Sequence, residues 1–97
     1  MAHPAEAEAW QWDDGNEAEL AGHGIDAREV AEVLVNGPTW VPNRRYRAGD
    51  WKMIGETNGG RRLTVVIRHV VDQSLSRAIT GGDSTAGEQA RYRKGRR

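Results

Sequence analysis

The chain has 97 residues, 37% of them hydrophobic, which suits one small domain and leaves too little length for a second core. It has no cysteine, and its three histidines are far apart, so we expect no disulfide, no metal site and no cofactor. Its apolar runs are too short to cross a membrane, and its first residues lack the pattern of a secretory signal. These features predict a cytoplasmic protein with no membrane partner.

The fourteen basic and fourteen acidic residues are separated along the chain. Residues 1–43 hold nine acids and one base, a net charge of −8, whereas residues 44–97 hold thirteen bases and five acids, a net charge of +8. A half this basic attracts a polyanion, with nucleic acid as the first candidate. The alternative is that the two halves neutralise each other in the folded protein.

The acidic half predicts a short strand followed by two helices. Residues 1–8 are small and acidic, and we expect them to be disordered. An alternating segment at 10–12 reads as a strand. Asp13 or Asp14 then caps the first helix, and Asp26 caps the second.

The basic half has the hydrophobic period of strands. We expect four strands and a last helix, at 40–47, 51–57, 63–71, 75–80 and about 84–94. The segment Gly81–Ser84 should end the fourth strand, with Asp83 or Ser84 capping the helix. The whole predicts a single α+β domain over 9–94, in which an antiparallel sheet of about four strands follows the short strand and the two helices. A basic tail at 95–97 completes the chain.

Two turn signals define a predicted register for this sheet. Asn58 with Gly59 predicts a two-residue hairpin turn, which places Glu56 opposite Arg61. The turn at 72–73 places Arg68 opposite Arg77, an unfavourable pair unless a phosphate or an acid from the N-terminal half lies between them. Side chains alternate between faces, so one larger apolar face is expected under the helices. That face carries Trp51, Met53, Thr64, Val66, Arg68, Val70, Leu75, Arg77 and Ile79.

Several motifs match a known family in order and spacing. They are Trp12-Asp13, Asn16, His23-Gly24-Ile25, Arg28–Val33, Arg62–Ile67, Arg77–Thr80, and Glu88 with Tyr92. Together, over residues 12–92, they resemble the BrnT-type toxins, the ribonuclease half of type II toxin–antitoxin pairs within the RelE/ParE superfamily. The segment 43–47 and Gly82 depart from the family, which usually carries an arginine where Gly82 stands.

The resemblance implies a RelE/ParE-like fold and metal-independent cleavage of RNA that inhibits translation. It implies a cognate antitoxin that neutralises the toxin, with a ribbon-helix-helix protein as one candidate, and DNA contacted only through that antitoxin. The ribosome is a further candidate partner. The alternative, which Gly82 favours, is a catalytically silent relative that holds an antitoxin-type partner and contacts nucleic acid.

Cleaving RNA without a metal needs a base on the 2′-hydroxyl, a cation to stabilise the phosphorane and an acid for the leaving oxygen. The catalytic candidates are His69 as acid or base, Lys52 and Arg77 as phosphate stabilisers, and Tyr92 as acid. The candidate RNA-binding residues are Arg44, Arg45, Arg47, Arg61, Arg62 and Arg68. The catalytic candidates also have structural interpretations, as a rim histidine, a solvated lysine and a packed tyrosine.

Overall fold

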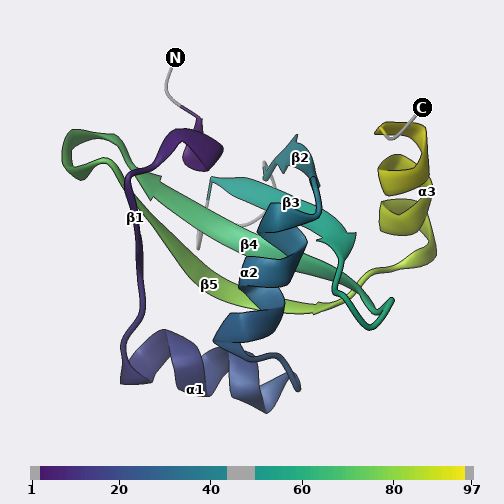
Figure 1. Ribbon diagram of the computed structural model, residues 1–97, viewed down its shortest axis with the longest axis horizontal. Helices are drawn as coiled ribbons and strands as arrows, with labels where there is room; N and C mark the ends of the chain where they lie inside the picture. The colour runs from purple at the N-terminus through teal and green to yellow at the C-terminus, as the bar shows by residue number, and fades with distance from the viewer. Residues whose placement is uncertain (1–2, 44–49, 96–97) are drawn as a thin grey trace.

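A computed structural model describes residues 3–43 and 50–95 of the chain. Its helices are α1 (Asp14–Gly22), α2 (Ala27–Val35) and α3 (Ala86–Gly95), with short 3-10 turns η1 (Pro4–Glu6) and η2 (Val71–Gln73). Its strands are β1 (Ala9–Gln11), β2 (Thr39–Pro42), β3 (Trp51–Glu56), β4 (Arg62–Val70) and β5 (Leu75–Asp83). The α+β class and the C-terminal helix predicted from the sequence are confirmed (Figure 1).

The sheet differs from the prediction in its first strand. Its order is β1-β5-β4-β3-β2, and β1 pairs with β5 in parallel while the other neighbours are antiparallel. The short strand expected to precede the sheet is therefore one of its edges. A parallel pair needs a long connection, and here the connection runs through α1, α2 and strands β2 to β4.

The first hairpin is one residue out of the predicted register. Its loop has three residues: the Thr57 amide donates to the Arg61 carbonyl at 2.9 Å, and Gly60 has a left-handed φ of 87°. A glycine in that conformation is typical of three-residue hairpin loops. Glu56 consequently pairs with Arg62 rather than Arg61, and the slip exchanges the faces of β3 relative to those of β4.

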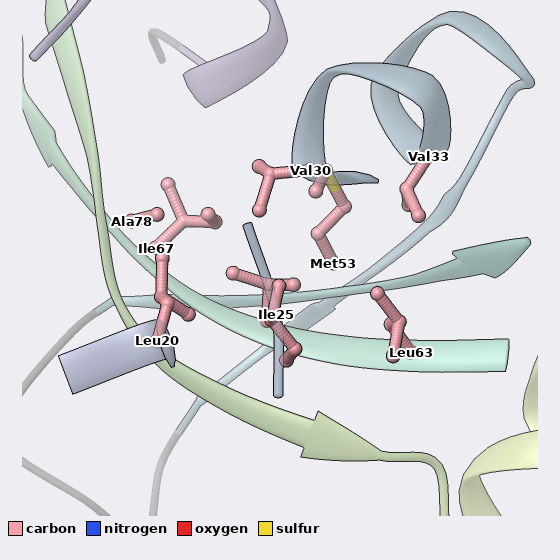
Figure 2. Close-up of a cluster of buried hydrophobic side chains, with 9 residues drawn as sticks. Leu20, Ile25, Val30, Val33, Met53, Leu63, Ile67 and Ala78 are labelled. Atoms are coloured by element: carbon pink, nitrogen blue, oxygen red, sulfur yellow. The ribbon is translucent and has the colours of Figure 1, made fainter. Parts of the chain in front are cut away.

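This slip changes which face lies under the helices. The prediction placed Thr64 and Val66 there, but the neighbouring residues of β4 occupy that position. The core that joins the sheet to α1 and α2 consists of Leu20, Ile25, Val30, Val33, Met53, Leu63, Val65, Ile67 and Ala78 (Figure 2). Thr64 and Val66 lie on the opposite face, which is called the open face below because α1 and α2 do not cover it.

The second hairpin has the predicted register, with Arg68 opposite Arg77 and His69 opposite Ser76. Its loop is longer than predicted, because Val70 pairs with Leu75 and η2 lies between them. Loops of two and of four residues centred on the same point give the same register. The prediction was therefore right in pairing although wrong in loop length.

Strand β5 continues through the glycines that were expected to end it. Gly81 pairs with Val65 and Gly82 with Thr64. A Cβ atom on Gly81 would lie 2.9 Å from the Thr64 carbonyl oxygen and 3.2 Å from Ile25 Cδ1. The first glycine therefore serves close packing within the strand rather than a turn.

The helix caps agree with the sequence for the first two helices. Asp13 accepts from the Asn16 amide at 3.1 Å, and Asp26 from the Glu29 amide at 2.8 Å. The third helix begins later than expected. Thr85, not Asp83 or Ser84, accepts from the Glu88 amide at 3.2 Å, and the Glu88 carboxylate accepts from the Thr85 amide at 2.8 Å. This reciprocal pair is a capping box.

Residues 3–8 have defined contacts where composition predicts disorder. The His3 ring lies against Trp40 and Trp51, with ring centroids 5.0 and 4.7 Å away. Pro4 is buried, and its carbonyl accepts a hydrogen bond from Ser76 Oγ at 3.0 Å. These contacts hold η1 against one end of the sheet.

Candidate functional site

The open face contains a cavity between the sheet and the start of α3. Its volume is about 300 Å³, and it is lined by Lys52, Thr64, Val66, Thr80, Gly81, Gly82, Asp83 and Glu88. Strands β3, β4 and β5 supply the floor because their paired residues Lys52, Val66 and Thr80 share this face. The capping box of α3 brings the Glu88 carboxylate over the same strands.

Glu88 is the centre of the polar contacts in this cavity. Its carboxylate lies 3.4 Å from Lys52 Nζ and accepts a hydrogen bond from Thr64 Oγ1 at 3.0 Å. Burial raises the pKa of Glu88, but hydrogen bonds from Thr85, Thr64 and Lys52 outweigh burial and hold the pKa below its ordinary value. Glu88 is therefore ionised at neutral pH and neutralises Lys52.

Gly82 leaves one wall of the cavity open. No atom lies within 4 Å of the position that its Cβ would occupy. The position of the family's arginine therefore faces empty space in this chain. Lys52 is the only cation that lines the cavity among the residues that the structure describes.

The predicted register places Lys52 and His69 on the same face of the sheet, but the structure puts them on opposite faces. Lys52 shares the open face with Val66, whereas His69 lies on the side of the sheet that carries Ile67 and the core. His69 Nδ1 is 3.2 Å from Ser76 Oγ, which is fully buried. His69 therefore belongs to the contact between the sheet and η1, and the sheet itself separates it from Lys52.

Arg77 is bound by an acid of the N-terminal half, one of the two alternatives that its place opposite Arg68 left open. Its guanidinium donates to Asp13 Oδ1 at 3.0 Å and to Gln11 Oε1 at 3.2 Å. The hydrogen bond from Arg77, followed by that from the Asn16 amide, lowers the pKa of Asp13 from 3.8 to about 2. Arg77 thus ties the start of α1 to β5.

Tyr92 and Arg62 pack together on α3 and β4. Tyr92 is 4% exposed, and the Arg62 guanidinium carbon lies 5.3 Å from the centre of its ring, within the range of a cation–π contact. Arg62 Nε also donates to Glu56 at 3.0 Å. Tyr92 is therefore a packing residue, and it does not line the cavity.

Arg61 joins three parts of the fold. Its guanidinium donates to Asp83 at 2.8 Å, to Glu29 at 3.3 Å and to the Gly24 carbonyl at 2.6 Å. Arg68 is exposed on the open face. The remaining predicted RNA-binding residues, Arg44, Arg45 and Arg47, lie outside the described residues.

The sequence patterns did not single out Glu88 and Thr64 as site residues. The spacing of Thr85 and Glu88 is a capping-box signal that could have placed Glu88 at the start of α3. The contact of Glu88 with Lys52 spans 36 positions, and no local pattern predicts it.

No family model and no curated protein matches this chain. Over 3–43 and 50–95, no group of three or more His, Asp or Glu side chains is placed to hold a metal ion. Within the same ranges, no helix is both long and apolar enough to cross a membrane. The function is therefore inferred from the contacts of the described side chains and from the sequence motifs.

Proposed function

We propose that this chain is a BrnT-like binding module of a type II toxin–antitoxin pair. It acts in the cytoplasm, holds an antitoxin-type partner and contacts nucleic acid without cleaving it. The motif resemblance supports the family. One observation supports the silent form: four of the predicted functional cations already contact carboxylates. These ion pairs are Lys52 with Glu88, Arg61 with Asp83 and Glu29, Arg62 with Glu56, and Arg77 with Asp13.

Internal pairing matters because cleavage needs positive charge aimed at the phosphate as its charge grows. A cation that holds a carboxylate must give it up before it stabilises a phosphorane. The acid and base expected for the reaction are also displaced, since His69 lies on the other side of the sheet and Tyr92 is buried. Lys52 alone does not supply the three roles that the reaction requires.

The second candidate is an RNA-cleaving toxin neutralised by its antitoxin. The specific observation in its favour is that Lys52 and Glu88 lie 3.4 Å apart in a cavity on the open face. Glu88, ionised at neutral pH, would take the proton of the 2′-hydroxyl as that oxygen attacks phosphorus. Lys52 would stabilise the charge on the phosphate oxygens. The bond from phosphorus to the 5′-oxygen then breaks, that oxygen takes a proton from water, and the products are a 2′,3′-cyclic phosphate and a 5′-hydroxyl.

An RNA-cleavage assay in EDTA separates the two candidates. The unaltered chain, Lys52→Ala and the matched control Lys94→Ala, which changes an exposed lysine of α3, are incubated with one single-stranded RNA. We expect no cleavage by any of them. Cleavage that Lys52→Ala abolishes and Lys94→Ala retains would establish the second candidate instead.

Partner binding is tested on the same proteins. The chain is co-expressed with the small protein encoded beside it and purified through a tag on the chain alone. We expect the partner to be retained by the unaltered chain and by Lys52→Ala equally. If the unaltered chain retains no neighbouring protein, the proposal of a toxin–antitoxin module is wrong.

A further inference from the structure

An apolar groove lies on the helical side of the molecule, between β1 and α2. Its volume is about 180 Å³, and it is lined by Trp10, Trp12, Val30, Ala31 and Leu34. Trp10 pairs with Ser76, on the side of the sheet that also carries the core. Figure 1 shows α2 crossing the middle of that side while β1 lies at its edge. Helix α2 therefore leaves the edge strand β1 partly uncovered on this side of the sheet.

The groove continues onto the outer surface of α2. An adjoining hollow shares Ala31 and extends to Val35, and its other lining residues are Arg28, Glu32 and Asn58. Val35 is 83% exposed, the only large hydrophobic residue so exposed in the described part of the chain. Two tryptophans line the groove, and tryptophan is among the residues that contribute most to binding energy.

Exposed carboxylates close in sequence to the tryptophans indicate the charge of a partner that would bind the groove. Glu8 precedes Trp10 by two positions, Asp14 follows Trp12 by two, and Glu17 lies one turn further along α1. All three are exposed, and none has an ion pair among the described residues. Asp14 and Glu17 also suit the first turn of a helix, but Glu8 has no helix to stabilise. Carboxylates two positions from each of the tryptophans that line the groove fit a basic segment.

We propose that this groove binds a basic amphipathic helix of a partner protein. Aliphatic side chains enter between Trp10, Trp12 and Leu34, and lysine or arginine side chains face the carboxylates. The occupant is a helix because it extends an incomplete helical layer, and an amphipathic helix in a groove is a recurrent mode of recognition. The inference rests on the proposed function in one respect, that the partner is the antitoxin-type protein.

Two synthetic peptides test the groove without that partner. Both carry leucine at i, i+3, i+4 and i+7 of a helix, the first with lysine and the second with glutamate elsewhere. Titration followed by tryptophan fluorescence should show saturable, salt-sensitive binding of the lysine peptide only. Equal binding of both peptides, or binding of neither, overturns the proposal. A dimer of the chain alone that shields the same tryptophans also overturns it, because the occupant is then a second copy.

Matched variants locate the binding. Leu34→Asp adds a carboxylate yet should weaken the lysine peptide by about tenfold, because it removes an apolar wall. Ala90→Asp adds the same charge at an exposed position of α3 and should not weaken it. Ala31→Gln obstructs the groove from an exposed helix position. It therefore tests the groove even if Leu34→Asp does not fold. If neither groove variant weakens binding, the groove is not the site.

The same variants separate this inference from the proposed function. If the co-expressed partner is retained by the unaltered chain and equally by Ala31→Gln, the groove assignment is wrong while the module remains. If no neighbouring protein is retained but the lysine peptide binds with the expected dependence on Ala31, the groove stands and the toxin–antitoxin assignment is wrong.

Discussion

The two faces of the sheet differ in what covers them and in how polar groups are used. The helical face packs Leu63, Val65 and Ile67 against α1 and α2, and each is fully buried. The open face alternates with it along β4 and carries Thr64 and Val66 beside a cavity. One strand thus builds the core with every second residue and the lining of a cavity with Thr64 and Val66 between them.

The comparison shows that several of the basic residues proposed for RNA binding and cleavage also hold the helices to the sheet. Lys52 and Arg62 hold α3 to the sheet through Glu88 and the Tyr92 ring, and Arg77 holds α1 to β5. The opposite charges of the two halves of the sequence therefore meet in part inside the fold. Net charge by segment overstates how much cation is available to an RNA.

Substitutions at two neighbouring valines of β4 compare how much each face contributes to the free energy of unfolding. Val65→Ala removes fully buried methyl groups from the core, and the free energy of unfolding should fall by about 2 kcal/mol. Val66→Ala removes the same atoms beside the cavity and should cost about 1 kcal/mol or less. Urea unfolding of the two variants measures the difference. Equal losses would mean that the faces are packed alike.

Neighbouring glycines on β5 make a second comparison. Gly81→Ala would bring a methyl group to 2.9 Å from the Thr64 carbonyl oxygen, and we expect a loss of about 1–2 kcal/mol from strain. Gly82→Ala meets no atom within 4 Å and should leave the melting temperature unchanged or slightly raised. A melt in which Gly82→Ala is the more damaging substitution contradicts the described strand.

The smallest expected effect is a change in the pKa of Asp13 when its partner Arg77 is replaced. The pKa of Asp13 is about 2, below its ordinary 3.8, so the pair stabilises the fold above about pH 4 and loses this contribution as pH falls toward 2. Arg77→Gln should return the pKa of Asp13 toward 3.8, measured by NMR titration of the carboxyl carbon. Arg68→Gln, the control on the adjacent strand, should leave it low.

Local patterns in the sequence predicted the elements better than the contacts between them. The caps Asp13 and Asp26 and the second hairpin's register were predictable because each depends on neighbouring residues, whereas the place of β1 beside β5 was not. The first hairpin slipped because Gly60, directly after Asn58 and Gly59, takes the left-handed position of a longer loop. That single residue moved Thr64 and Val66 away from the helices and changed the predicted site.

The separation of the catalytic candidates had a different cause. His69 and Lys52 lay on one predicted face only because of the predicted register of the first hairpin. The one-residue error in that register therefore also made the predicted site wrong. Two of the ion pairs join residues far apart in the chain, Arg77 with Asp13 across 64 positions and Lys52 with Glu88 across 36. Such pairs depend on the complete fold, and spacing along the chain does not reveal them.

The central claim, that internal carboxylates occupy the cations of the described surface, is tested by the salt dependence of RNA binding. One triple variant, Asp13→Asn, Glu56→Gln and Glu88→Gln, removes the acids that hold Arg77, Arg62 and Lys52. Its substitutions preserve side-chain shape, and asparagine still caps α1. The matched control, Glu8→Gln, Asp14→Asn and Glu17→Gln, changes net charge equally but removes acids that have no ion pair within 3–43 and 50–95.

Affinity for one single-stranded RNA is measured at several salt concentrations for the unaltered chain and both triple variants. Each freed cation should steepen the logarithmic salt slope by about 0.7 when it contacts a phosphate. We predict a slope steeper by about 2 for the first triple variant and a nearly unchanged slope for the control. Identical slopes for the two variants would show that the paired cations gain no phosphate contacts when their carboxylates are removed, and would contradict the account.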